Sequence, residues 1–179
     1  MDSIRSQYQN KGVAAYYQTE GSAYRNPHEE AVRACFRASC GLWGLDLTNV
    51  LDLACGSGEI TLEVQALGGR ATGIDPYTGQ AYLTRTGQTA LPLTFEDIAL
   101  RGLGDKRFSL VVCSYAMHLV DPSWMPVLVH QLAQVTSNLL ILTPHKRPDL
   151  TQYGWDLKGL QTISRTHAKI FQPRTYSLP

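Results

Sequence analysis

The sequence lacks the features that would take it into or across a membrane. It contains no apolar run of about eighteen residues, the length that begins to suggest a transmembrane helix. Its start shows no charged stretch followed by an apolar core and a cleavage site. These absences give no support to membrane insertion or secretion, and they predict a cytoplasmic location.

Ordered cysteine patterns and an excess of one charge are also missing. Four cysteines, Cys35, Cys40, Cys55 and Cys113, have neither metal-ligand nor disulfide-framework spacing, so we predict reduced thiols and no metal site. Sixteen basic and fifteen acidic side chains leave a net charge of +1, unlike a dedicated nucleic-acid binder. From residue 145 onward, however, six Lys or Arg face two Asp. This basic end could meet an anionic substrate or form a solvated surface.

The chain also shows no internal repeat and no low-complexity tract that would divide it. Its 179 residues are enough for a single domain that buries about two thirds of its unfolded surface. Within this domain we distinguish a leader over residues 1–45, a core over 46–144 and a short C-terminal segment over 145–179.

One run of residues carries most of the functional information. Val50–Glu59 is typical of an apolar strand, a turn with Gly56 and Gly58, and a helix start, and Asp75 ends the next strand. Glycines let the backbone approach a ligand closely, and the first N–H groups of a helix can bind an anionic group. A carboxylate at the end of the second strand can hold two ribose hydroxyls. The run therefore predicts a site for a nucleoside-containing cofactor.

Two details separate this run from a dinucleotide-binding fingerprint. Thr61 stands where that fingerprint has its third glycine, and Asp52 ends the first strand, where a pyrophosphate needs no acid. A carboxylate in that place suits a cationic ligand with an amino-acid tail. The order Asp-x-x-x-Gly-x-Gly, followed by Asp75, resembles the S-adenosylmethionine (SAM) site of class I methyltransferases.

The resemblance implies roles for residues well beyond the glycine turn. Asp75 matches the acid that holds the ribose, and Asp97 and Ile98 match the pair that contacts the adenine, although Asp97 could instead cap a helix. Ala54 and Ser109 depart from the family, which often has a glycine and an acid at these positions. SAM is the implied cofactor and S-adenosylhomocysteine (SAH) the implied product. The implied cofactor-binding residues are Tyr24, Arg25, Asp52, Ala54, Gly56, Ser57, Gly58, Asp75, Pro76, Asp97, Ile98, Cys113 and Ser114.

Short apolar strands alternate with helical patterns from Val50 onward, which predicts an α/β fold with parallel strands. The resemblance implies a Rossmann-like, mostly parallel sheet of order 3-2-1-4-5 with helices on both faces. It also implies an N-terminal helical lid formed by the leader, and we expect one or two additional C-terminal strands. Along 162–171, Arg165, His167 and Lys169 are expected on a solvated face. The core strands are expected at 50–54, 70–74, 90–95, 108–113 and 138–143.

Two histidines follow strands that should be neighbours. Ligands of open α/β sheets bind beyond the carboxyl ends of the strands, a rule that selects His118 after the fourth strand and His145 after the fifth. Either imidazole could serve as base for an acceptor that carries a proton, or could simply pack and hydrogen-bond locally, and Tyr115 could orient the acceptor. The predicted substrate-binding residues are Tyr17, His28, Lys146 and Arg147.

The segment after the fourth strand bears on the substrate. Methyltransferases that act on exocyclic amines of bases or on glutamine side chains typically carry an Asn/Asp-Pro-Pro-aromatic loop there. Cys113-Ser114-Tyr115-Ala116 is not such a loop and is more similar to the small-molecule enzymes. We therefore predict methyl transfer from SAM to an O, N or S atom of a small, polar or anionic metabolite, by a monomer or homodimer. Two alternatives stay open: a methyltransferase acting on RNA or a protein side chain, and a non-catalytic SAM-binding regulatory or scaffold protein.

Overall fold

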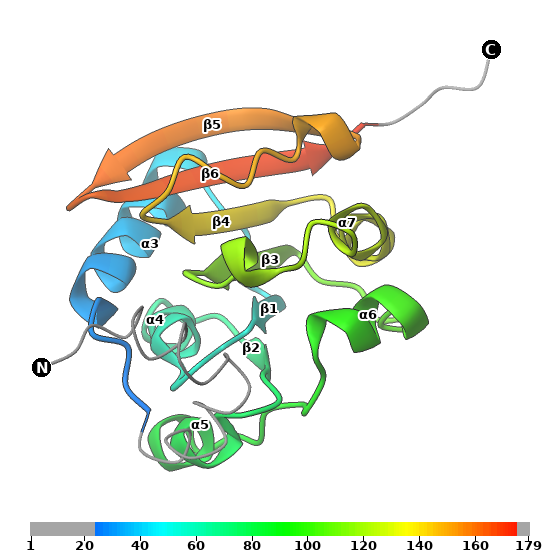
Figure 1. Ribbon diagram of the computed structural model, residues 1–179. Coiled ribbons are helices and arrows are strands. Elements are labelled where there is room, and N and C mark those ends of the chain that lie inside the picture. Colours follow the sequence, from blue (N-terminus) through cyan, green and yellow to red (C-terminus); the bar gives the residue numbers. More distant parts are fainter. Residues whose placement is uncertain (1–23, 175–179) are drawn as a thin grey trace, which may run out of the picture.

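The computed structural model describes residues 24–174, which form a six-stranded sheet with helices on both faces (Figure 1). The sheet has the order β2-β1-β3-β4-β6-β5, in which β2, β1, β3 and β4 are parallel and β6 is antiparallel to both β4 and β5. The strands are β1 (Val50–Leu53), β2 (Ala71–Ile74), β3 (Leu110–Ser114), β4 (Leu139–Thr143), β5 (Trp155–Ile163) and β6 (Thr166–Pro173). The α/β, Rossmann-like prediction is confirmed.

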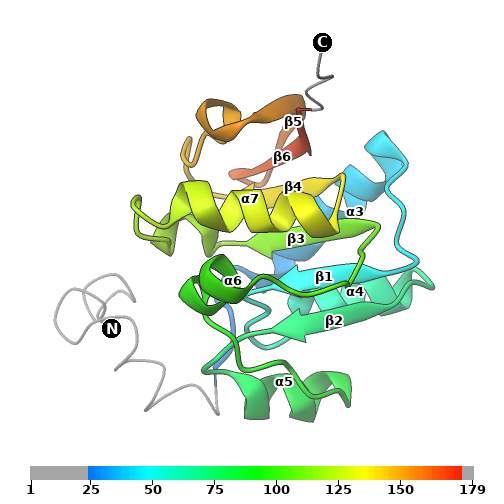
Figure 2. The same cartoon turned by 90° about the vertical axis from the view of Figure 1, so that its right-hand side faces the viewer.

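The helices cover the two faces of the sheet in pairs. Figure 2 shows α6 and α7 on one face, α3 and α4 on the other, and α5 beyond the β2 edge. The helices are α3 (Glu29–Trp43), α4 (Glu59–Ala66), α5 (Gly79–Thr86), α6 (Phe95–Arg101) and α7 (Met125–Val135), with short 3₁₀ turns η2 (Met117–Leu119) and η3 (Thr151–Tyr153).

Alternating side chains of the strands divide the core between the two faces. Val50 of β1 packs with Val32 and Phe36 of α3 on one face, whereas Leu51 and Leu53 pack with the α6 and α7 side. These side chains are almost fully buried. Because β1, β3 and β4 are covered on both faces, they are continuously apolar apart from Asp52 and the strand ends.

The third strand expected at 90–95 is reduced to a single parallel bridge between Ile74 and Leu91. Pro92 has no N–H to donate to a longer ladder, and the Thr94 side chain accepts from the Asp97 N–H to begin α6 at Phe95. The bridge lies beside β2, where the sequence placed the strand. The segment 90–95 therefore lies beside β2 as predicted, but it forms a single bridge instead of a strand.

Two strands rather than one complete the sheet. β5 and β6 form an antiparallel hairpin joined at Ser164 and Arg165, whose φ values are 49° and 65°. The prediction that Lys169 faces solvent is wrong, since only 8% of this residue is exposed. Its side chain lies beneath the loop that follows β4, where the ammonium group donates hydrogen bonds to backbone carbonyls.

The leader differs from the expected helical lid over 1–45. Residues 29–43 form α3, which packs on the sheet through Val32, Cys35, Phe36 and Ser39 and is therefore part of the scaffold. Residues 1–23, including Tyr17, lie outside the described part of the chain. Among residues 24–174, no helix is long and apolar enough to cross a membrane.

Candidate functional site

The chain turns sharply between β1 and α4. Ala54, Gly56 and Gly58 have φ values of 57°, 54° and 90°, in the left-handed region that glycine adopts freely and that strains a residue with a Cβ. Ala54 adopts this conformation without being glycine. A hydrogen bond of 2.8 Å from the Gly58 N–H to the Cys55 carbonyl closes the turn. The predicted strand, glycine turn and helix start are all present.

The two glycines of the turn have different neighbours. A Cβ on Gly56 would lie 3.2 Å from Cε1 of Tyr24 and 3.6 Å from Oε2 of Glu59, in the space between two side chains that line a cavity. A Cβ on Gly58 would lie 2.4 Å from Cγ2 of Thr86, which belongs to α5. Gly56 thus opens space at the cavity, whereas Gly58 lets α5 pack against the turn.

Asp75 is fixed by backbone N–H groups from both of its neighbouring segments. Its Oδ2 accepts from the Gly56 N–H at 3.2 Å, and its Oδ1 accepts from the N–H groups of Tyr77 at 2.8 Å and Thr78 at 3.0 Å. The Thr78 hydroxyl in turn donates to the Gly56 carbonyl at 2.7 Å. A carboxylate offers about four acceptor positions, so Asp75 keeps acceptor capacity for a ligand in the cavity.

Glu59 is a second buried carboxylate at the cavity, and the sequence interpretation missed it. Its Oε1 accepts from the Ser57 hydroxyl at 2.7 Å and from the Asn26 N–H at 3.3 Å, and Arg85 approaches to 3.7 Å. Only 2% of the residue is exposed. The signal that could have identified Glu59 is an acid directly after the second glycine of the turn.

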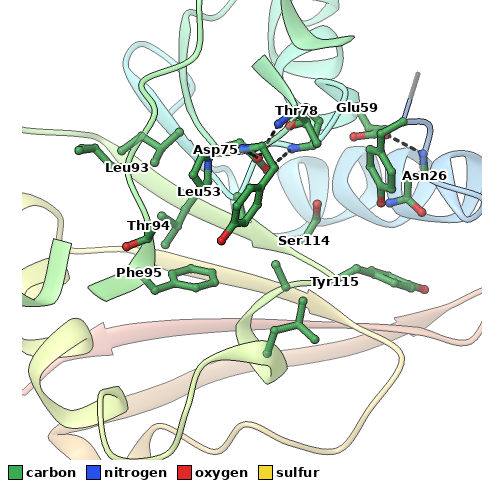
Figure 3. A pocket seen from close by; sticks show the side chains of 18 of the residues that line it. Asn26, Leu53, Glu59, Asp75, Thr78, Leu93, Thr94, Phe95, Ser114 and Tyr115 are labelled. Carbon is green, nitrogen blue, oxygen red and sulfur yellow. Dashed lines mark hydrogen bonds between the residues drawn. The ribbon is translucent and has the colours of Figure 1, made fainter. Parts of the chain in front are cut away.

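These residues surround a cavity of about 260 Å³ beyond the carboxyl ends of β1, β2 and β3. Figure 3 shows Leu93 and Phe95 toward one end, Glu59 and Asn26 toward the other, and Asp75 between them. An apolar end suits a planar ring, and a polar end suits charged groups. Seven predicted residues line the cavity: Tyr24, Ala54, Gly56, Asp75, Pro76, Ser114 and Tyr115. The lining residues that were not predicted are Asn26, Leu53, Glu59, Ile74, Tyr77, Thr78, Leu93, Thr94, Phe95, Glu96, Ala116 and Leu119.

Asp52 lies beneath the turn and does not line the cavity. Its Oδ2 accepts from the N–H of Thr61 at 3.0 Å and from its hydroxyl at 2.8 Å, and this hydroxyl also pairs with the Tyr82 hydroxyl at 2.9 Å. Its Oδ1 has no partner among the described residues. Burial, with a further contribution from the carboxylates of Glu59 and Asp75, raises the pKa of Asp52 to about 8. A cofactor contact for Asp52 stays a prediction.

The residues predicted to contact the adenine are used elsewhere in this structure. Asp97 accepts from the Thr94 N–H at 3.1 Å in a capping box, and these Thr94 contacts lower the pKa of Asp97. Ile98 is fully buried in the core. Thr94, Phe95 and Glu96 line the cavity instead, so the cavity is approached by the start of α6 rather than by its third and fourth residues.

Several other predicted cofactor residues also lie off the cavity lining. Ser57 is buried and donates to Glu59, and Cys113 is buried within the sheet, where burial raises the pKa of its thiol to about 12. Arg25 has an exposed side chain that donates to Glu29 at 3.3 Å. In this structure these three residues therefore lie outside the cavity lining.

The two histidines come together as the strand order predicted. The ring centroids of His118 and His145 are 4.9 Å apart in an edge-on arrangement. Both histidines are exposed and lie outside the cavity lining, although Ala116 and Leu119 beside His118 belong to the lining. Partial burial and the neighbouring imidazole lower the pKa of His118. Lys146 and Arg147, which follow His145, are exposed.

Tyr115 also lines the cavity, three residues before His118 in the chain. Its φ of 55° is unusual for a residue with a bulky side chain, and such strain often marks a functional position. The Tyr115 hydroxyl pairs with that of Thr166 at 2.8 Å, and its ring stacks on His28 with centroids 5.4 Å apart. His28, a predicted substrate residue, therefore reaches the site through Tyr115.

Comparison with known proteins identifies a methyltransferase domain in this chain. Residues 50–138 match the family model described as "Methyltransferase domain". The uncharacterized protein C17A5.05c of Schizosaccharomyces pombe is 31% identical over 230 residues, and the match covers 96% of this chain and 92% of that protein.

Solved structures with similar folds include SAM-dependent methyltransferases. A TehB-like enzyme from Corynebacterium glutamicum has a TM-score of 0.61 at 13% identity, covering 95% of this chain and all of that one. Magnesium protoporphyrin IX methyltransferase from Synechocystis, with bound SAM, has a TM-score of 0.57 at 16% identity, covering 94% and 93%. The glycopeptide N-methyltransferase MtfA, also with SAM, has a TM-score of 0.66 at 15% identity, covering 84% and 100%. At these identities the likeness concerns the fold.

Proposed function

The chain belongs to the class I SAM-dependent methyltransferases, and we propose that it methylates an O, N or S atom of a small, polar or anionic metabolite. Membership makes the protein an enzyme that uses SAM, so the alternative of a non-catalytic SAM-binding protein is set aside. The observation that carries the substrate proposal is the cavity of about 260 Å³, whose lining includes Ala116 and Leu119, on either side of His118 in the chain, while His118 itself contacts His145.

The cavity fits the cofactor on the evidence of its own residues. The missing side chain at Gly56 leaves a cradle between Tyr24 and Glu59, which a Cβ would enter. SAM supplies, when bound, a methyl group activated by its positively charged sulfur. Two buried carboxylates, Glu59 and Asp75, line the cavity, which favours a ligand that carries positive charge.

We assign the parts of the cofactor to the walls by their chemistry. Asp75 would accept from a ribose hydroxyl with its remaining acceptor position, and its three backbone N–H bonds would hold it in place for this contact. Glu59 would accept from the ammonium group of the methionine part. Leu93 and Phe95 would enclose the adenine ring. Phe95 takes over the position that sequence reasoning gave to Asp97.

The acceptor end would lie at Tyr115, which lines the cavity after β3. Since much of the rate of an in-line transfer comes from positioning, a fixed Tyr115 wall would orient the acceptor. His118 or His145 would remove the proton of an acceptor that carries one. A lowered pKa keeps His118 neutral, and therefore able to accept a proton, at neutral pH. Lys146 and Arg147 would bind a carboxylate or phosphate of the acceptor.

The first experiment tests the cofactor assignment. SAH should raise the melting temperature of the wild type and bind measurably by titration calorimetry. Absence of both effects would refute the proposed site.

The second experiment tests the acceptor class. SAH production should be measured with pools of small carboxylates and phosphates, and in parallel with RNA and with protein substrates. Turnover confined to RNA or protein would favour the alternative substrate class. Once an acceptor is found, kcat should be measured for His118→Ala and His145→Ala. A near-normal kcat in both variants would show that neither histidine acts as the proposed base.

A further inference from the structure

Lys169 is a buried cation in the middle of β6. It pairs in register with Ile141 of β4, a position where an apolar side chain would pack readily. Its ammonium group instead donates to two backbone carbonyls, those of Lys146 and of Pro148, the second at 3.2 Å. Both carbonyls belong to the segment that follows β4.

This segment, residues 144–150, contains no helix or strand. Its carbonyls cannot pair within a ladder, and buried backbone groups need a partner. Burying an ammonium group is costly unless its donors are satisfied. Desolvation lowers the pKa of Lys169, and the nearby Asp149 carboxylate acts in the opposite direction. The hydrogen bonds to the segment thus offset the free energy that burial of the Lys169 ammonium group costs.

The same segment places His145 next to His118. His145 follows β4, and its N–H donates to the Thr143 hydroxyl at 3.1 Å. His118 follows the neighbouring strand β3, and the two rings meet at 4.9 Å. The two carbonyls that Lys169 holds are one and three residues beyond His145. After the Thr143 hydroxyl, which holds His145 itself, Lys169 is the next side chain that holds this loop near the histidine pair among the described hydrogen bonds.

We propose that Lys169 is a positioning residue, which holds the loop after β4 so that His145 stays against His118 at the acceptor end of the cavity. The inference deepens the proposed function and rests on it for the meaning of the histidine pair. Lys169 itself touches neither the cofactor cavity lining nor the imidazoles in the described contacts. Its effect is on the geometry of the acceptor end alone.

The test compares Lys169→Met with the wild type by NMR and calorimetry. Methionine keeps the length and apolar stem of the side chain and removes the donors. In the wild type we expect a ring-to-ring nuclear Overhauser effect between His118 and His145. In Lys169→Met this signal should be lost and the pKa of His118 should rise toward its ordinary value, because its ring gains solvent and loses its neighbour. SAH affinity should stay unchanged.

Two further variants keep the result interpretable. Lys158→Met removes an exposed ammonium group of β5, which pairs with Asp156 at 3.2 Å, and should alter neither histidine signal. Lys169→Arg can still donate to both carbonyls and should retain the ring contact. If Lys169→Met does not fold, Lys169→Leu, which also has no donors, decides by the same signals.

An unchanged ring contact and His118 titration in a folded Lys169→Met or Lys169→Leu variant would overturn the inference. This outcome differs from failure of the proposed function, which would appear as absent SAH binding in the wild type.

Discussion

Replacing Asp52 by Asn should make the stability of this protein less dependent on pH. Asp52 is fully buried, and its Oδ2 accepts two hydrogen bonds from Thr61. Its Oδ1 has no partner among the described residues, and burial raises its pKa to about 8. Asparagine can accept the same bonds through its amide oxygen and carries no charge at any pH.

Proton linkage gives the sign and the size of the effect of pH on the stability that Asp52 contributes. The folded state binds a proton at Asp52 more tightly than the unfolded chain does, because the folded pKa of about 8 exceeds the ordinary aspartate pKa of 3.8. The contribution of Asp52 to stability is therefore complete below pH 4 and is lost as the pH rises toward 8. At about 1.4 kcal/mol for each pH unit between these values, the loss is at most on the order of 6 kcal/mol.

Urea unfolding at several pH values between 5 and 9 measures this difference. The free energy of unfolding of the wild type should fall relative to Asp52→Asn as the pH rises, so that the variant becomes the more stable protein at pH 8 to 9. The control is Asp46→Asn, an exposed loop carboxylate whose pKa is lowered by the Thr48 N–H, which should leave the slope unchanged. Parallel curves for wild type and Asp52→Asn would refute the reasoning.

Three further substitutions test the site and its scaffold. Asp75→Asn should weaken SAH binding by roughly 10- to 100-fold in calorimetry, because a hydrogen bond to a charged group contributes about 1.5–3 kcal/mol; Asp46→Asn is the matched control. Ala54→Gly should raise the free energy of unfolding by up to about 1 kcal/mol in urea, because the left-handed φ of 57° costs alanine about 1–2 kcal/mol, partly offset by the chain entropy of glycine; a clear loss of stability would contradict this. Glu63→Gln should lower it by about 1–3 kcal/mol, since this buried carboxylate pairs with two guanidinium groups of α3 that are partly screened by solvent; the exposed Glu30→Gln should change little.

Much of the fold could be predicted from local sequence patterns. Apolar runs between turn residues located β1 to β4, and the strand order brought His118 and His145 together as expected. The expected strand at 90–95 was not formed, because Pro92 and the Thr94 cap act against the apolar pattern. Competition between a strand pattern and a helix start within six residues is difficult to resolve from sequence.

The site was less predictable than the fold because it depends on where side chains turn. Asp52 and Glu59 both flank the glycine turn in sequence, yet only Glu59 lines the cavity. Asp52 instead faces Thr61 of α4. Lys169 was expected on a solvated face because polar residues alternate along its strand, whereas the loop after β4 covers it. Contacts between segments distant in sequence decide both cases.

The glycine spacing that identifies the site serves packing as much as ligand binding. A Cβ on Gly73 would lie 2.5 Å from the Tyr82 ring, and one on Gly58 would lie 3.2 Å from the same ring. Tyr82 is fully buried, and its hydroxyl reaches the Thr61 hydroxyl, which in turn bonds Asp52. One aromatic ring of α5 thus requires glycine both in the turn and in β2. Of the glycines in the turn, Gly56 alone borders the cavity. The motif therefore combines one glycine that faces the ligand site with one that allows packing. Its spacing depends on the position of α5 as well as on that of the cofactor.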